Sequence, residues 1–203
     1  MNRSTSMDQF ATLLKREWMQ HRTGWLALSL VPMGLLLLAV VFGDMKIGNN
    51  VSGGSWEEAG TAGPLPIFAM VLAATALSTM AMAWLATLIQ ASGLARRDQQ
   101  DRSIEFWLSL PVGHVQSLGA TLLVHLLLVP IGALLLGLLG GAVLALLVTL
   151  KAFGVSNLVG LPWGDLLVAV AATTARLMVG VALATAWLSP LILGGMAASA
   201  WLK

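Results

Sequence analysis

The chain has 203 residues, of which 58% are hydrophobic and only 10% are charged, whereas ordinary soluble domains carry about 25% charged residues. Because several apolar runs exceed the ~20 residues that a helix needs to cross a bilayer, the composition predicts an all-α, polytopic membrane protein. The formal net charge of +2 is too small to indicate nucleic-acid binding, and the lack of cysteine excludes disulfides and thiolate metal sites.

Residues 8–23 form the first predicted element, an amphipathic helix. Its mostly apolar face repeats at helical spacing and consists of Phe10, Leu13, Leu14, Glu17 and Trp18. Basic residues flank this face. We therefore expect the helix to lie in the cytoplasmic interface of the membrane, with Trp18 at headgroup level, rather than to form a simple N-terminal extension.

Four membrane spans are predicted after this helix. The first three cover about 25–42, 65–88 and 115–150, and the polar stretches 43–64 and 151–164 are expected to be exposed loops. Residues 165–202 are apolar but too long for one span at about 1.5 Å per residue. We expect an interfacial helix over 163–174 and a fourth span that ends near residue 201. Two crossings with a turn at Ser189-Pro190 are the alternative.

The positions of lysine and arginine predict the orientation. If the N-terminus is cytoplasmic, eight of the 11 basic residues face the cytoplasm: Arg3, Lys15, Arg16, Arg22, Arg96, Arg97, Arg102 and Lys203. The other three, Lys46, Lys151 and Arg176, lie outside or within a span. Because basic residues accumulate on the cytoplasmic side, both termini and the segment between the second and third spans are predicted to be cytoplasmic.

That segment, residues 96–111, combines a charged run with an apolar one. Asp98 or Asp101 can cap a short helix, and Pro111 ends it. The helix carries more apolar surface than two turns can bury alone, on Ile104, Phe106, Trp107, Leu108 and Leu110. Such a surface suits a groove on a soluble partner. A short charged loop that only anchors the topology is the alternative.

The segment also resembles a known family. The run Gly93-Leu94-Ala95-Arg96-Arg97-Asp98, followed by Ser103-Ile104-Glu105-Phe106-Trp107-Leu108-Ser109-Leu110-Pro111-Val112, resembles the cytoplasmic loop of ABC-2 type transporter permeases. In that family a charged stretch leads to Glu-Phe, then to Leu-Ser-Leu-Pro, then to a helix that re-enters the membrane. The basic N-terminus and residues 186–203 are similar to the family as well.

The resemblance implies that residues 1–203 are the transmembrane domain of an exporter in a cell membrane, the bacterial inner membrane being expected. Its partners would be a cytoplasmic ATP-binding subunit, which holds ATP and Mg²⁺, a second permease copy or homologue, and membrane lipid. The helix over 103–110 would be the coupling helix, and the partner-binding residues would be Arg102, Ser103, Ile104, Glu105, Phe106 and Leu110. The family usually has six spans, so the four seen here imply a fragment or the absence of the last pair.

Catalytic motifs are missing from the sequence. It has no P-loop and no Gly-x-Ser-x-Gly elbow, so we expect neither ATP hydrolysis nor a cofactor in this chain. The three histidines, His21, His114 and His125, are too far apart in sequence to predict a zinc site. A membrane scaffold for another cytoplasmic protein remains the alternative function. An intramembrane enzyme would require His125 or Asp98 for activity.

Two ionisable residues fall within predicted spans, where polar groups usually face protein or water. We expect His125 to make a structural hydrogen bond to Ser78 or Thr79 on the second span, rather than to relay protons. Arg176 is expected to extend to the headgroups from the start of the fourth span, rather than to bind substrate. Gly137 and Gly141 have the spacing that allows close helix approach, which we expect within the chain.

Overall fold

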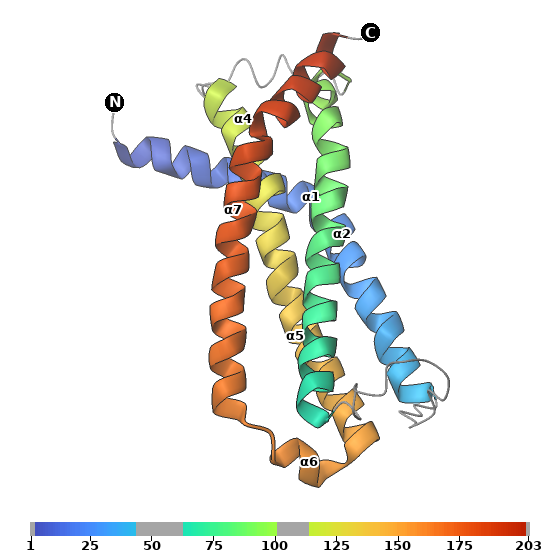
Figure 1. The fold of residues 1–203 in the computed structure, drawn as a ribbon. Helices are drawn as coiled ribbons and strands as arrows, with labels where there is room; N and C mark the ends of the chain where they lie inside the picture. The colour runs from blue at the N-terminus through green and yellow to red at the C-terminus, as the bar shows by residue number, and fades with distance from the viewer. Residues whose placement is uncertain (1–2, 44–62, 101–113, 202–203) are drawn as a thin grey trace.

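The computed structural model describes residues 3–43, 63–100 and 114–201, and within these ranges the chain forms helices and no strand. The elements are α1 (Arg3–Phe42), α2 (Pro64–Gln100), α4 (His114–Leu123), the π-helix η1 (Val124–Leu128), α5 (Val129–Phe153), α6 (Val155–Val159) and α7 (Trp163–Trp201). Figure 1 shows an elongated bundle with α6 at one end and both chain termini toward the other.

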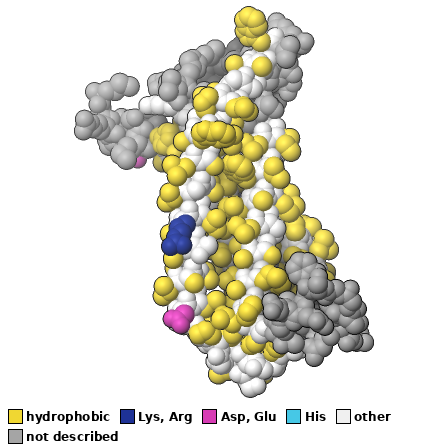
Figure 2. All heavy atoms as spheres, viewed as in Figure 1, with side chains coloured by type: hydrophobic (Ala, Val, Ile, Leu, Met, Phe, Trp, Pro, Cys, Tyr) yellow, Lys and Arg dark blue, Asp and Glu magenta, His cyan; other side chains and the backbone are white. Residues whose placement is uncertain are grey.

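Four helical stretches among the described residues are long and apolar enough to cross a membrane: Phe10–Phe42, Pro64–Gln90, Gly119–Phe153 and Trp163–Ala198. Large apolar side chains such as Leu139, Leu183 and Trp187 are exposed on the bundle. Figure 2 shows hydrophobic side chains over most of the visible face. Apolar side chains suit contact with lipid, and the helical backbone satisfies its own hydrogen bonds in a bilayer. The prediction of an all-α protein with four spanning helices is confirmed.

The predicted first helix and first span form one continuous helix, α1, of 40 residues. Figure 1 shows that the N-terminal part of α1 and its remainder run in different directions. The apolar face predicted for residues 8–23 packs partly within the protein: Leu13 is buried, and Leu14 packs against a cluster centred on Trp25. Trp18 remains 46% exposed. Contact between this part of α1 and the membrane interface stays a prediction.

Helices α2 and α5 pack closely through two glycines of α5. A Cβ atom added to Gly137 would lie 2.8 Å from the Cα of Ala76, and one added to Gly141 would lie 3.0 Å from the carbonyl oxygen of Leu72. Both contacts involve the backbone of α2, so a larger residue would push the helices apart at Gly137 and crowd them at Gly141. The expectation that Gly137 and Gly141 serve packing within the chain is confirmed.

The fourth predicted span differs from the structure. Instead of a separate interfacial helix over 163–174, α7 is one helix of 39 residues that continues through Pro190. The alternative with a turn at Ser189-Pro190 is also wrong. Trp163 packs edge-on against Phe68 of α2, with 5.5 Å between the ring centroids. Because Leu166 is buried beside Phe68, the start of α7 is held within the bundle rather than along its end.

The loop predicted over 151–164 is also largely helical. Helix α5 continues to Phe153, and α6 occupies Val155–Val159. Lys151, expected in an exposed loop, instead donates hydrogen bonds to the carbonyl oxygens of Val40, Val41 and Gly43 at 2.9, 3.2 and 2.6 Å. The last carbonyls of a helix lack partners within the helix, so this ammonium caps the end of α1.

Candidate functional site

His125 lies in the π-helix η1, at the junction between α4 and α5. The N–H of Val129 donates to the carbonyl of Val124, five residues earlier. Pro130 follows and has no N–H, so an α-helix would leave the carbonyl of Leu126 without its usual donor. Thr185 of α7 supplies one, through a hydroxyl 2.9 Å from that oxygen. Single π-turns of this kind occur frequently at functional sites.

The surroundings of His125 differ from those predicted. Ser78 and Thr79, the expected partners, both donate to the carbonyl of Thr75, at 3.1 and 2.8 Å. The Nδ1 atom of His125 lies 3.0 Å from the carbonyl oxygen of Thr121, one turn earlier on its own helix. The expectation of a hydrogen bond from His125 to the second span is therefore wrong. The imidazole of His125 is directed toward α1 and not toward α2.

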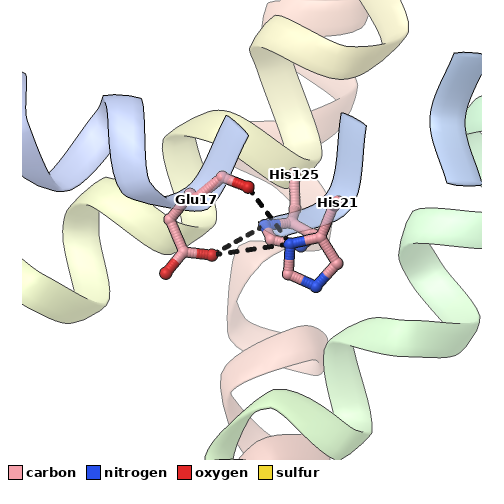
Figure 3. A group of neighbouring side chains, drawn as sticks. All are labelled: Glu17, His21 and His125. Atoms are coloured by element: carbon pink, nitrogen blue, oxygen red, sulfur yellow. Dashed lines mark hydrogen bonds and ion pairs between the residues drawn. The ribbon is translucent and has the colours of Figure 1, made fainter. Parts of the chain in front are cut away.

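Two residues of α1 meet His125 and form with it the Glu17–His21–His125 cluster (Figure 3). The carboxylate oxygen Oε2 of Glu17 lies 4.0 Å from Nδ1 of His21 and 4.0 Å from Nδ1 of His125. The side chains of Glu17 and His125 are 5% and 0% exposed, and that of His21 is 18% exposed. The other carboxylate oxygen, Oε1, forms an ion pair with Arg16 at 2.7 Å.

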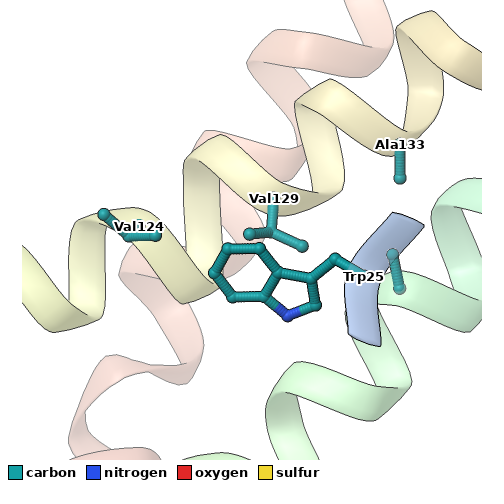
Figure 4. Close-up of a cluster of buried hydrophobic side chains, with 5 residues drawn as sticks. Trp25, Val124, Val129 and Ala133 are labelled. Atoms are coloured by element: carbon teal, nitrogen blue, oxygen red, sulfur yellow. The ribbon is translucent and has the colours of Figure 1, made fainter. Parts of the chain in front are cut away.

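The indole ring of Trp25 contacts both histidines of the cluster. The ring of Trp25 stacks on His21 with 5.3 Å between centroids and meets His125 edge-on at 5.2 Å. The two imidazoles meet edge-on at 4.8 Å. Trp25 itself is packed against Val124, Val129 and neighbouring apolar side chains (Figure 4). Burial of Glu17 and His125 lowers the local dielectric around them, which strengthens the electrostatic interaction between these two side chains.

Glu17 and His21 were not predicted from the sequence to be site residues. The signal was local: Glu17 and His21 are four residues apart, so a helix places them on one face. Their partner His125 lies far along the chain, on another helix. The sequence alone does not show that α1 directs Glu17 and His21 toward η1. The cluster with His125 is therefore evident only from the tertiary structure.

The partner-binding residues predicted from the family resemblance lie outside the described residues, namely Arg102, Ser103, Ile104, Glu105, Phe106 and Leu110. The flanking helices are described. Helix α2 continues past residue 88, the predicted end of the second span, to Gln100. Helix α4 begins at His114, next to the predicted start of the third span at residue 115. Figure 1 shows both of these helix ends at the end of the bundle where the termini lie.

Arg176 does not lie at a junction between an interfacial helix and a span, because α7 is continuous there. Its side chain is exposed on α7, as are those of Leu167 and Val168 about two turns earlier. Arg176 lies roughly 20 Å along the helix from Trp163, at about 1.5 Å per residue. Extension of its side chain to headgroups remains a prediction.

An apolar cavity of about 210 Å³ lies between α2, α5 and α7. Its lining includes Leu72, Leu134 and Leu166, and the polar groups in it are the hydroxyls of Thr173 and Thr174. No charged side chain lines it among the described residues, so the cavity has no group that would select one class of polar substrate. Comparison with protein-family models, curated proteins and solved structures finds no match to this chain.

Proposed function

We propose that the chain is the membrane-spanning permease subunit of an ABC exporter, coupled to a separate cytoplasmic ATPase. The observation that carries the proposal is the extension of α2 past the predicted second span. The helix continues from residue 88, where that span was predicted to end, to Gln100, which adds roughly 18 Å at about 1.5 Å per residue and includes the charged run Arg96-Arg97-Asp98. Such an extension would carry the predicted coupling helix, residues 103–110, away from the membrane surface and toward a soluble partner.

The packing of α2 supports a mechanical role. Force applied where α2 ends would travel along a single helix, and α2 is in backbone contact with Gly137 and Gly141 of α5. The other side of the segment leads through α4 and η1 into the same α5. In this proposal, ATP-driven closure of the ATPase pushes on residues 103–110. The push shifts the first, second and fourth spans relative to one another and opens an outward path.

The proposal includes an orientation and an assembly. The N-terminus is cytoplasmic, the protein lies in a cell membrane, and residues 8–23 contact the cytoplasmic interface. The distribution of basic residues supports this orientation, since eight of 11 fall on the proposed cytoplasmic side. A second permease copy or homologue completes the transporter. The exposed apolar surface of α7, on residues such as Leu183 and Trp187, is available for lipid or for that partner.

Association with the ATPase tests the proposal. Candidate ATPases are co-expressed with the tagged permease, and the amount of ATPase that co-purifies from detergent is measured. Glu105→Lys reverses a charge and Phe106→Ala removes an apolar anchor, so each should lower co-purification by more than about tenfold, the effect of a 1.4 kcal/mol loss. Lys46→Ala is the control, because in the proposed topology residue 46 lies on the opposite side of the membrane from the coupling helix. Normal association of both coupling variants would contradict the proposal.

A further inference from the structure

We propose that the Glu17–His21–His125 cluster binds one divalent transition-metal ion, with Zn²⁺ as the ion that best suits its donors. The three side chains offer two imidazole nitrogens and one carboxylate oxygen, and these atoms lie within 4.8 Å of one another. Two histidines and a glutamate are a donor set that proteins use for zinc. Calcium and magnesium prefer several oxygen donors, and this cluster has one carboxylate. The proposal does not depend on the function proposed above.

The geometry requires a small contraction. Each Nδ1 atom lies 4.0 Å from the same Oε2 atom of Glu17. In a tetrahedral site with bonds of about 2.0–2.1 Å, donor atoms are about 3.4 Å apart, so these two separations must shorten by roughly 0.6 Å. The third separation, between the two imidazole nitrogens, lies within 4.8 Å and must shorten by about 1.4 Å at most. Rotation of the imidazoles about their side-chain torsions would supply this movement in the proposed site.

Binding exchanges hydrogen bonds for coordinate bonds. The Nδ1 atoms now lie 3.2 and 3.0 Å from the carbonyl oxygens of Glu17 and Thr121, which they contact as N–H donors. A metal ligand must offer a lone pair, so each neutral imidazole would carry its proton on Nε2 when the ion is bound. No net proton is released by this tautomeric change. Affinity should fall in acid, because protonated imidazole has no free lone pair.

The two oxygens of Glu17 have separate roles. Oε1 pairs with Arg16, which fixes the orientation of the carboxylate, while Oε2 faces the two histidines. A buried carboxylate is stabilised by positive charge nearby, and an ion at Oε2 would supply it from the side opposite Arg16. His21 and Arg16 are partly exposed, at 18% and 21%, so the ion would approach the cluster from their side.

The consequence is a metal link between two distant parts of the chain. Glu17 and His21 come from α1, and His125 comes from the π-helix η1, where an extra residue in the turn sets its direction. An ion there would tie the N-terminal part of α1 to the third span. Because the ion binds the folded arrangement and not the unfolded chain, it would raise the stability of that arrangement.

The test measures Zn²⁺ binding to the purified full chain in detergent micelles. Metal is first removed with a chelator, Zn²⁺ is then titrated by calorimetry, and Co²⁺ is used as a spectroscopic substitute. We expect one ion per chain and visible absorption bands typical of tetrahedral Co²⁺. His21→Ala and Glu17→Gln should each weaken binding by more than about tenfold, at least as much as the loss of a group that supports a ligand.

The variants avoid His125, whose burial makes its replacement a risk to folding. Helix content and gel-filtration behaviour identify any variant that is misfolded. His114→Ala is the matched control: it removes a histidine about three helical turns from His125 along the same span, and it should bind Zn²⁺ normally. Absence of binding by the native chain would overturn the proposal, as would binding unchanged in both His21→Ala and Glu17→Gln.

Discussion

The hydroxyl of Thr185 donates a hydrogen bond to the carbonyl oxygen of Leu126, at 2.9 Å, and so joins α7 to the π-helix η1. The carbonyl needs this donor because residue 130 is proline, which lacks the N–H that would bond to it in an α-helix. Within a bilayer, water cannot replace such a donor. This polar contact therefore links the fourth span to an irregular turn in the third.

Removing this hydroxyl should destabilise the protein. Thr185→Val keeps the side-chain shape but leaves the carbonyl of Leu126 without its donor from α7, which should cost about 1–2 kcal/mol. Unfolding by SDS in mixed micelles, followed by tryptophan fluorescence, measures the change. Thr185→Ser retains the hydroxyl and should remain close to the native stability.

Pro130→Ala gives this prediction a second, independent test. Alanine restores an N–H at position 130, so the carbonyl of Leu126 can be satisfied within its own helix. Thr185→Val should then cost less in the Pro130→Ala background than in the native chain. An equal cost in both backgrounds would show that Thr185 acts through packing alone.

Lys151 should contribute to stability at the opposite end of the bundle. Its ammonium contacts three carbonyl oxygens at the end of α1, where the negative end of the helix dipole favours a cation. Lys151→Met should lower the free energy of unfolding by about 1 kcal/mol in the same SDS assay. Lys151→Arg keeps the charge and should lose less. Equal stability of Lys151→Met and the native chain would contradict the capping role.

Gly137 and Gly132, both in α5, form a matched pair for testing helix packing. A Cβ atom at Gly137 would lie 2.8 Å from the Cα of Ala76, whereas one at Gly132 would meet nothing within 4 Å. Gly137→Ala should therefore destabilise the protein by about 1–3 kcal/mol, the usual result of overpacking. Gly132→Ala should be neutral or stabilising because alanine favours helix. Similar effects at both positions would argue against close contact between α2 and α5.

The sequence predicted those parts of the fold that depend on local composition. The four apolar stretches are long, so length alone predicted spans over 65–88 and 115–150, where α2 and the continuous run of α4, η1 and α5 lie. Continuity was harder to predict. Trp163 and Leu166 look like residues of an interfacial helix until their packing against Phe68 is known. That contact joins α2 to α7 and is not encoded in the pattern of either helix alone.

The candidate site was predictable only in part. His125 drew attention because an ionisable side chain is costly at membrane depth, and it lies fully buried as that argument implies. Its partners were assigned to the wrong helix. Glu17 was counted as part of an apolar face, although its carboxylate points toward two imidazoles. The direction of a helix face depends on how α1 bends and on the π-turn at η1, which composition and spacing do not determine.

Site-specific crosslinking from position 104 tests the central claim most directly. The chain has no cysteine, so Ile104→Cys introduces a unique attachment point for a photocrosslinker, and Asn49→Cys provides a control on the other side in the proposed topology. Both variants are examined in membranes that contain the co-expressed ATPase. The account predicts capture of the ATPase from position 104 and none from position 49. Labelling of position 104 from the cytoplasm without capture of the ATPase would contradict the permease assignment.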